Sequence, residues 1–349
     1  MSNLPPSGEI PRGAIRFNTD SNKPELWDGS QWAEFQLSTP NLGRSVDTQP
    51  GARGVFAGGG LNPADVDVID YINISSTGNA TDFGDLTGNR RTHGTGASQT
   101  RGLCMGGYSG SGKASIDTFI FASEGNATDY GDLELGARWN TAGASNATRA
   151  VLMGGETPSP NTYVNEIEYM VIASTGAGID FGNLTAACRP GGQNGLASPT
   201  RAVVAHGNTP SGRVNTINFI TITTLGDAQD FGDLTVSRNR SGALSNAVRG
   251  LFGGGADHPT QYDIIDHITI AAGGNAVSFG DLTQSGFRGG AVSSPIRGVW
   301  GGKTDSGGGS ITNVIDYVNI QTEGDAVDFG DLSNNRAQST GCSNAHGGL

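Results

Sequence analysis

Short apolar runs separated by Gly, Asn and Ser recur along most of the chain. In one stretch, "RGVFAGGG" at 53–60 is followed by "VIDYINIS" at 68–75 and then by "TDFGDL" at 81–86. The runs are rich in β-branched and aromatic residues, and nowhere does the chain show an amphipathic helical period of useful length. The pattern therefore predicts an all-β protein of short strands joined by tight turns.

These runs return as a repeat. A short "GASN"-like run precedes the next copy, so each repeat supplies four short strands. A period of about fifty residues is typical of a propeller blade or of a solenoid unit. Six repeats begin with Arg followed by Gly or Ala, and they follow one another at nearly even spacing: Arg53, Arg101, Arg149, Arg201, Arg249 and Arg297.

The strands are apolar on both faces, as Val68, Ile69, Tyr71 and Ile72 illustrate, so each sheet must be covered on both sides. Blades packed face to face around an axis meet that need and leave only short, protected edges. A β-solenoid is the alternative, but its turns are usually much shorter than the repeat of this chain. We therefore interpret residues 41–349 as a six-bladed β-propeller with four-stranded blades.

The stretch "ATDFGDLTGNRR" at 80–91 recurs in all six repeats with an aromatic residue before Gly, and we call it the aromatic-Gly motif. Its Asp82 and Asp85 could supply oxygen ligands to calcium. Alternatively, they form a turn in which Gly takes positive φ while Phe and Leu anchor the loop. Because Ser278 and Asn183 replace them in other repeats, a turn is predicted. The motif Asp and Asn side chains should then bond backbone amides, and no metal should be needed.

One connection in the repeat is fixed in length while another varies. The acid or amide of the third strand always precedes the motif Leu by the same interval, as from Asp70 to Leu86. The interval from the starting Arg to that acid differs between repeats, so the second-to-third connection varies in length. Blade geometry places these connections on one rim, where aromatic and charged residues are candidates for partner binding and a plain solvated loop is the alternative. The candidates are Tyr108, Lys113, Tyr163, Arg213, His258, Tyr262, Lys303 and Asp305.

The repeated Arg also has two interpretations. Six guanidinium groups around a channel could bind an anion, or each could bond carbonyl groups or an acid of the neighbouring blade. Because this Arg occupies the same place in every repeat, the structural role is the expected one. The histidines occupy different places in their repeats and are not expected to converge as ligands.

Composition excludes several functional classes. Of 349 residues 57 are Gly without a collagen-like period, which fits many tight turns. The net charge of −12, with no Lys/Arg run, argues against nucleic acid and anionic membranes as partners. Cys104, Cys188 and Cys342 lack CxxC or Cys/His spacing, so neither a disulfide framework nor a zinc site is predicted. With no signal peptide or spanning apolar run visible, we expect a soluble protein made in a cytoplasm, without membrane insertion.

Common enzyme motifs are absent from the sequence. It contains no sialidase-type Ser-x-Asp-x-Gly-x-x-Trp box, no GxSxG, no HExxH and no Walker sequence. The glycine runs at 58–60 and 253–255 end strands instead of opening helices, so they are not phosphate loops. We therefore expect no enzyme activity and no cofactor, and we assign no catalytic, cofactor-binding or metal-binding residue.

Residues 1–40 lie outside the repeats. "GAIRFN" and "PELWDG" alternate apolar and polar residues around a turn, which predicts a β-hairpin with Trp32 after a second turn. A lone hairpin is only marginally stable unless it packs on something. We predict that this segment attaches the protein to a partner through Phe17, Leu26, Trp27 and Trp32.

The pattern "GAIRFNTD", a turn and then "LWDGSQW" closely resembles a short module common in virion structural and tail-fibre proteins of tailed phages, over roughly residues 13–35. The repeats resemble kelch repeats in their Gly-Gly after the second strand, although the aromatic-Gly motif replaces the usual kelch Tyr and Trp pair. Over about 53–345 they are similar to repeats of uncharacterised virion proteins in phages of marine bacteria, cyanophages among them. These resemblances imply a kelch-like fold and a particle component, with no catalytic residues to carry over.

The sequence therefore predicts a phage virion structural protein: a tail fibre, a tail-associated protein or a capsid-decorating protein, made in the host cytoplasm. We expect it to belong to a multi-copy assembly with other virion proteins, and to bind a partner or a host surface receptor or glycan. The competing class is a lectin or glycosidase-like propeller that acts on host glycan. Convergent carboxylates near Tyr residues at the axial mouth would favour that class.

The strand count predicts how the ring closes. A "GxSN"-like first strand precedes the second to sixth repeated Arg, but the chain before Arg53 reads "SVDTQPGA" and does not match. The missing copy is "STGCSNAHGGL" at 339–349. We predict that residues around 338–345 supply the first strand of the blade formed by residues 53–87, which removes a free edge.

Overall fold

The computed structural model describes residues 10–18, 23–34, 52–61, 64–158, 161–287, 289–305 and 310–349. The chain divides into two compact units, residues 1–49 and residues 50–349. Every regular element among the described residues is a β-strand. The larger unit consists mainly of four-stranded antiparallel sheets, so the prediction of an all-β chain is confirmed.

The small unit is an antiparallel sheet of β1 (Ile15–Asn18), β2 (Lys23–Trp27) and β3 (Trp32–Glu34). The sequence predicts a two-stranded hairpin, but Trp32 begins a third strand and pairs with Trp27. The two indole rings lie 5.5 Å apart, and the guanidinium of Arg16 lies 4.2 Å over the Trp32 ring. The hairpin of β1 and β2 is thus packed against β3, which belongs to the same N-terminal segment.

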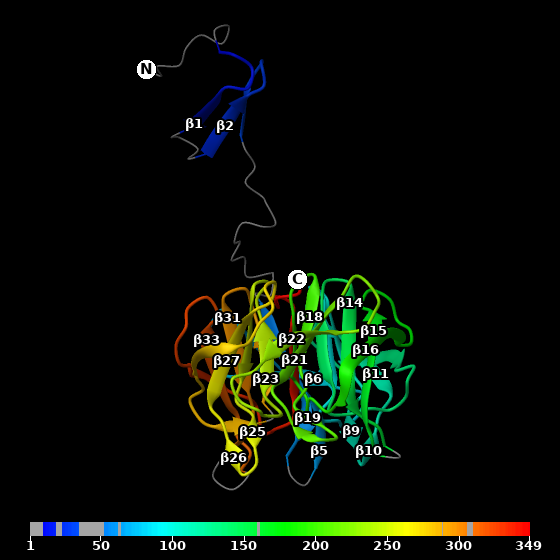
Figure 1. The fold of residues 1–349 in the computed structure, drawn as a ribbon. Coiled ribbons are helices and arrows are strands. Elements are labelled where there is room, and N and C mark those ends of the chain that lie inside the picture. Colours follow the sequence, from blue (N-terminus) through cyan, green and yellow to red (C-terminus); the bar gives the residue numbers. More distant parts are fainter. Residues whose placement is uncertain are drawn as a thin grey trace. The chain divides into compact units, whose positions relative to one another are not determined.

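The described part of the large unit contains six four-stranded sheets, which we number by their second strands (Figure 1). From first to fourth strand, sheet 1 is β35 (Thr340–Ser343), β4 (Arg53–Gly60), β5 (Asp65–Asn73) and β6 (Thr81–Asp85). Sheet 2 is β7 (Gly94–Ala97), β8 (Arg101–Met105), β11 (Ser115–Ile120) and β12 (Thr128–Asp132). Sheet 3 is β13 (Ala142–Ser145), β14 (Arg149–Glu156), β15 (Tyr163–Val171) and β16 (Ile179–Cys188). Sheet 4 is β17 (Gly195–Ala197), β18 (Arg201–Ala205), β21 (Thr216–Thr221) and β22 (Gln229–Asp233). Sheet 5 is β23 (Gly242–Ser245), β24 (Arg249–Gly253), β27 (Ile264–Thr269) and β28 (Val277–Asp281). Sheet 6 is β30 (Gly290–Ser293), β31 (Arg297–Gly301), β33 (Val314–Asn319) and β34 (Val327–Asp331).

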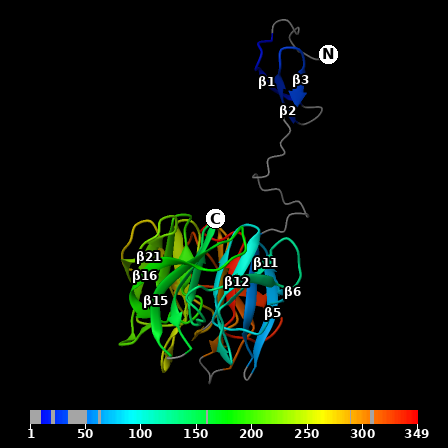
Figure 2. The same ribbon diagram turned by 90° about the vertical axis from the view of Figure 1, so that its right-hand side faces the viewer.

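Each sheet packs between two others. Figure 2 shows sheet 1, with β5 and β6, beside sheet 2, with β11 and β12. The first strands contact one another in the order β7, β13, β17, β23, β30 and β35, and β35 contacts β7. The apolar cores lie between adjacent sheets; one of them joins Val55 and Phe83 of sheet 1 to Cys104 and Phe119 of sheet 2. The strands are apolar on both faces because each face packs against a neighbouring sheet.

The strand predicted from residues 338–345 is present as β35, and it pairs with β4. The register places Gly341 opposite Phe56 and Ser343 opposite Gly54. Asn344 continues this contact, because its Oδ1 accepts the amide of Arg53 at 2.8 Å. Sheet 1 therefore combines strands from the two ends of the repeat region.

The aromatic-Gly motif joins each sheet to the next. The amide of Gly125 in sheet 2 donates to the carbonyl of Phe83 in sheet 1 at 2.7 Å. Gly84, with a φ of +143°, lies so close that an added Cβ would be 2.6 Å from the Gly125 carbonyl oxygen. Sheets 6 and 1 are joined in the same way, by a bond from Gly78 to Phe329. Gly occupies this place in the motif because two backbones meet there.

Three small hairpins extend the second-to-third connections of sheets 2, 4 and 5. They are β9 (Tyr108–Ser109) with β10 (Ser111–Gly112), β19 (Asn208–Thr209) with β20 (Gly212–Arg213), and β25 (Ala256–Asp257) with β26 (Thr260–Gln261). Figure 1 shows these hairpins along the lower edge of the large unit, which we call the hairpin rim. The connections that vary in length in the sequence are the ones that carry them.

Candidate functional site

Buried pairs of a cation and a carboxylate link neighbouring sheets, and we call each contact between adjacent sheets a seam. Arg90, which follows sheet 1, bonds Asp117 of sheet 2 at 2.7 Å, and both side chains are almost fully buried. Breaking such a pair is costly because the remaining charge has no counter-ion. Comparable pairs between sheets are Arg138 with Glu168, Arg238 with Asp266, and Arg336 with Asp70. Lys303 and Asp316 also form a buried pair, but Lys303 follows β31 and Asp316 lies in β33, so both belong to sheet 6.

The aromatic-Gly motif is not the predicted turn: residues 81–85 form the strand β6, and its aspartates do not play the predicted role. Among the described residues, neither Asp82 nor Asp85 bonds a backbone amide through its side chain. Instead, the carboxylate of Asp117 in the third strand of sheet 2 accepts the amide and the hydroxyl of Thr87, both at 2.8 Å. The loop after the motif is thus capped by an acid of the next sheet.

The seam between sheets 3 and 4 has no charged pair of this kind among the described residues. Cys188 stands where the other seams have a cation, and Asn218 stands where they have an acid. Asn218 Oδ1 still accepts the amide of Thr185 at 3.0 Å and its hydroxyl at 2.7 Å. Both charges are replaced together, so neither is left buried alone. Burial raises the pKa of the Cys188 thiol above its usual range, which makes this thiol unreactive.

The repeated Arg bonds a backbone carbonyl of another sheet. Arg53 Nη1 donates to Phe121 O at 2.8 Å, and Arg297 Nη1 donates to Ile74 O at 3.2 Å, from sheet 6 to sheet 1. The structural interpretation of this residue is confirmed. The other four donate to the carbonyls of Ile172, Ile222, Ile270 and Ile320.

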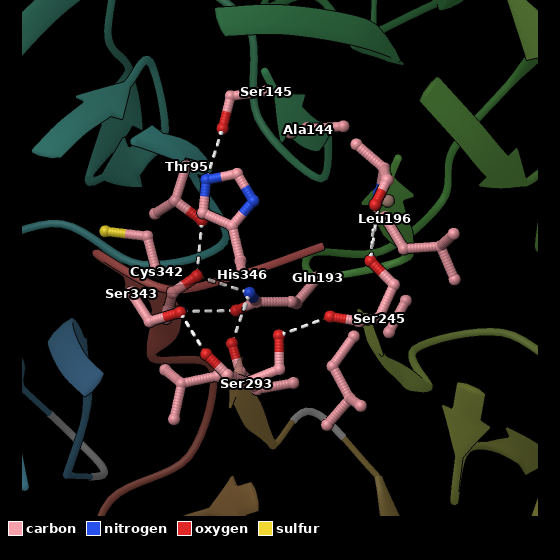
Figure 3. Close-up of a pocket in the computed structure, with 18 of the residues that line it drawn as sticks. Thr95, Ala144, Ser145, Gln193, Leu196, Ser245, Ser293, Cys342, Ser343 and His346 are labelled. Carbon is pink, nitrogen blue, oxygen red and sulfur yellow. Dashed lines mark hydrogen bonds between the residues drawn. The ribbon is translucent and has the colours of Figure 1, made fainter. Parts of the chain in front are cut away.

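A small polar cavity lies among the first strands (Figure 3). It encloses about 50 Å³, which is room for a few water molecules only. The serine hydroxyls that line it each donate to a carbonyl of the preceding first strand, as Ser145 does to Ala97 O at 3.0 Å. The other three are Ser245, Ser293 and Ser343.

Gln193 and His346 fill the space around this cavity (Figure 3). Gln193 Nε2 donates to Ala291 O at 2.8 Å, and His346 Nε2 donates to Ala97 O at 2.9 Å. The Gly348 amide donates to His346 Nδ1 at 3.1 Å, so the ring proton is on Nε2. Burial lowers the pKa of His346 to about 4. No carboxylate or Tyr is among the described residues that line the cavity, and its small volume leaves no room for a sugar.

On the hairpin rim, short rows of paired residues extend sheets beyond their main strands. In sheet 4 this row is Arg189, Asn208 and Arg213. Directly paired residues project from the same face of a sheet, so the two arginines flank Asn208 on one face. In the neighbouring sheet 3 the row contains Trp139 and Tyr163.

Charged groups and aromatic rings of neighbouring rows contact one another. Arg189 bonds Glu156 at 3.2 Å, and its guanidinium lies 5.2 Å over the ring of Tyr163. Arg213 bonds Asp257 at 2.5 Å. These contacts join the rows of sheets 3, 4 and 5 into one cluster of mixed charge.

Arg240 and Phe287 also belong to this cluster. The backbone of Arg240 has a φ of 59°, and its guanidinium lies 5.7 Å from the ring of Phe287. Burial, followed by the nearby charges of Arg189 and Arg213, lowers the pKa of Arg240 to about 10. Within the described part of the chain its guanidinium has no hydrogen-bond or ion-pair partner.

The predicted rim residues have different environments. Tyr108 packs on Trp139 at 5.3 Å, and His258 is exposed beside Phe287 at 5.6 Å. Tyr163 and Arg213 belong to the cluster described above. Lys113 and Tyr262 are partly exposed.

Lys303 is buried instead of presented on the rim. It is only 5% exposed, and its Nζ donates to Asp316 at 2.6 Å and to Gln284 O at 3.0 Å. In the seam between sheets 5 and 6, Gly286 stands where most other seams have a buried Arg, and Lys303 supplies the positive charge in its place. Asp305 lies in β32 (Thr304–Asp305), which pairs with β29 (Gly286–Phe287), and its side chain lies outside the described part.

Several residues of the cluster are not among the candidates that the sequence predicts. Trp139, Arg189, Arg240 and Phe287 belong to the connections from a fourth strand to the next first strand. Those connections lie on the same rim. The sequence prediction rests on the second-to-third connections, whose length varies between repeats, and therefore misses these residues. A usable signal is the position two residues after the buried Arg of a seam, as Arg240 follows Arg238.

The predicted attachment residues divide into buried and exposed side chains. Trp27 is buried, and Leu26 and Trp32 are partly buried within the small sheet. Phe17 is 59% exposed and Ile15, two residues earlier on β1, is 67% exposed. The exposed apolar surface of this unit therefore centres on β1.

Among the described residues, no group of His, Cys, Asp and Glu side chains could hold a metal ion. No described helix is long and apolar enough to cross a membrane. No protein-family model matches the chain, and no curated protein matches it.

Proposed function

We propose that residues 50–349 form a six-bladed, kelch-like β-propeller that serves as a structural component of a phage virion. The small N-terminal unit attaches it to the particle, and the hairpin rim faces a partner or host surface. One observation carries the proposal: the residues that repeat serve contacts between sheets, while chemically varied residues gather on one rim. A rigid scaffold with a single variable face suits display and binding better than catalysis.

The propeller is supported by contacts between sheets 6 and 1 that repeat those of the other seams. The Arg297 guanidinium bonds Ile74 O, the Gly78 amide bonds Phe329 O, and Arg336 pairs with Asp70. Each sheet then serves as one blade with a neighbour on both sides, and β35 supplies the inner strand of the first.

The virion assignment is supported by the small unit. Its sequence resembles a module of tailed-phage structural proteins, and Ile15 and Phe17 expose two large apolar side chains on alternate positions of one strand. Such a surface favours burial against another protein. The attachment role therefore belongs to β1 more than to Trp27, which is buried within the unit itself.

Incorporation into particles tests the proposal. Host cells that produce the particle would express the full chain, residues 50–349 alone, or the full chain with Ile15→Asp and Phe17→Asp. We expect only the unaltered full chain in purified particles, with equal melting temperatures for the large unit in all three proteins. Normal incorporation of residues 50–349 would place the attachment on the blades, and absence of the full chain from particles would reject the virion role.

A glycan-binding propeller is the second candidate, and the arginine and aromatic residues of the hairpin rim favour it. A glycosidase is less well supported. It needs two available carboxyl groups, whereas Glu156 is bonded to Arg189 and Asn140, and Asp257 to Arg213. We therefore propose binding without turnover. Release of reducing sugar from a bound polysaccharide by the purified protein would contradict this.

A further inference from the structure

The cluster on the hairpin rim has one more cation than it has carboxylates. Arg189 is paired with Glu156, and Arg213 with Asp257. Arg240 lies close enough to both arginines for their charges to act on it, yet its guanidinium has no acceptor among the described residues. One positive charge is therefore left without a partner in this part of the structure, in a protein whose net charge is −12.

The backbone holds Arg240 in a fixed position. Its amide donates to Pro190 O at 3.4 Å, and an added Cβ on Gly191 would lie only 2.7 Å from its Cγ, so the stem of Arg240 packs directly on that glycine. Its φ of 59° is left-handed, and equivalent positions in other sheets share this conformation, so the backbone here is a feature of the repeat. Only Arg240 carries a charge at this position, because the equivalent residues are Thr92, Asn140 and Gln338.

A bound anion would remove the electrostatic penalty at this position. Burial and the two neighbouring arginines disfavour the charged form of Arg240 more than the charge of Glu156 favours it, which is why its pKa is lowered to about 10. Because that value is still far above neutral pH, the guanidinium stays charged. A negative group placed against it would gain a charge-assisted hydrogen bond without displacing an existing partner.

We propose that Arg240, flanked by Arg189 and Arg213, binds the carboxylate of an acidic saccharide such as a uronic acid. A guanidinium presents a planar pair of donors that matches a carboxylate. Tyr163 and Trp139 lie in the adjacent row; Arg189 covers one side of the Tyr163 ring and Tyr108 packs on Trp139, and the part of each ring that stays exposed offers aromatic surface to a sugar ring. A polymer with one charge per sugar suits this site better than a dense polyphosphate, which the protein's net negative charge would repel. The inference holds whether or not the chain belongs to a virion.

The experiment compares three probes by calorimetry at low ionic strength: tetragalacturonate, its methyl ester and inorganic phosphate. The wild-type chain should bind tetragalacturonate, and added salt should weaken binding. Arg240→Asn should weaken it by about tenfold or more, because one charge-assisted bond is lost. Asn tolerates the left-handed backbone, so this variant should melt no lower than wild type. Gln338→Asn, at the equivalent position of sheet 1, should bind as wild type does.

Four outcomes would overturn the inference: no binding of tetragalacturonate by wild type, equal binding of the methyl ester, unchanged binding by Arg240→Asn, or tighter binding of phosphate than of the saccharide. Arg240→Lys is a second variant in case Arg240→Asn folds poorly. It keeps a long, positively charged side chain but loses the planar pair of donors. It should bind with intermediate affinity. If the chain does not bind tetragalacturonate, the particle-incorporation experiment can still succeed. If the chain is absent from particles, the calorimetry can still show saccharide binding.

Discussion

The seams and the hairpin rim are made by the same six repeats but follow opposite rules. In the seams the same contacts recur from sheet to sheet. Where the Arg is lost, either its acid is lost too, as Asn218 shows for Cys188, or another cation replaces it, as Lys303 does where the chain has Gly286. On the rim, the row of sheet 4 contains two arginines, while the equivalent places in sheet 1 are Ala337 and Asp65. A seam residue must satisfy a neighbouring sheet, whereas a rim residue faces mainly solvent. Repetition therefore marks packing, and its loss marks where a partner can bind.

The largest expected effect is loss of the contact that joins the two ends of the repeat region. Removing residues 338–349 would expose the edge of β4 and one face of its sheet. We expect aggregation in place of a local change, measured by soluble yield and size-exclusion chromatography. Removing only residues 347–349, which leaves β35 intact, is the control and should give soluble protein. A soluble monomer from the longer deletion would contradict the role of β35.

Next in size is the loss of one buried seam charge. Arg90→Met leaves the buried charge of Asp117 without a counter-ion, although Thr87 still donates to it, and should cost about 3–5 kcal/mol in urea unfolding. The double variant Arg90→Cys with Asp117→Asn copies the natural pair of the seam between sheets 3 and 4. It should recover most of that loss, because Asn can still accept from Thr87. A double variant no more stable than the single one would show that the two charges do not act as a pair.

Acid should weaken the fold through buried histidines. Burial lowers the pKa of His93 well below its usual value and that of His346 to about 4. Below about pH 6.5 the histidines of the unfolded chain bind protons, whereas the buried ones of the folded chain do not. The free energy of unfolding is therefore unaffected by these groups above that pH and falls as the pH drops toward 4. For His346 the loss should reach up to about 3 kcal/mol. His346→Gln, which keeps a donor for Ala97 O, should flatten melting temperature against pH; an unchanged slope would contradict this assignment.

A smaller effect should separate two copies of the repeated Arg. Arg53 bonds a carbonyl and also lies 4.6 Å over the ring of Tyr71, whereas sheet 2 has Thr118 at the place of that ring. Arg53→Met should cost about 1.5–3 kcal/mol. Arg101→Met should cost less by about 0.5–1 kcal/mol, because it loses neither the cation–π contact nor an ion pair such as that of Arg53 with Glu124 at 3.4 Å. Equal losses in chemical denaturation would show that the ring and Glu124 contribute nothing.

The smallest effect is expected on the rim. His258 is exposed, so His258→Ala should change the free energy of unfolding by no more than about 0.5 kcal/mol. A larger loss would mean that the rim also stabilises the sheets, and the contrast with the seams would weaken.

The repeated pattern is enough to predict the strands, the role of Arg53 and its equivalents, and the pairing of residues 340–343 with β4. Each depends on residues that recur at fixed spacing. The seam pairs cannot be predicted in this way, although Arg90 is part of the recurring stretch, because a buried and an exposed arginine look alike in a sequence. Its partner, Asp117, lies 27 residues further on and in another sheet.

The rim shows where sequence reasoning fails for a different reason. Lys303 is a rim candidate because it lies in a connection of variable length, but it is buried because Gly286 leaves its seam without an arginine. That compensation is visible only in space. The position of Arg240, two residues after a buried seam Arg, can be found in the sequence, but its two neighbouring arginines cannot, because Arg189 and Arg213 come close to it only in the folded chain.

The position of β4 has a mechanical consequence. This strand receives the chain that comes from the small unit, and it is paired on one side with β35 and on the other with β5. A pull on the chain before Arg53, directed along the strand, would load both ladders in shear, so their hydrogen bonds would have to yield together instead of one after another. We therefore expect a tether attached at this point to resist force better than one attached to an outermost strand such as β6, which is held by a single ladder.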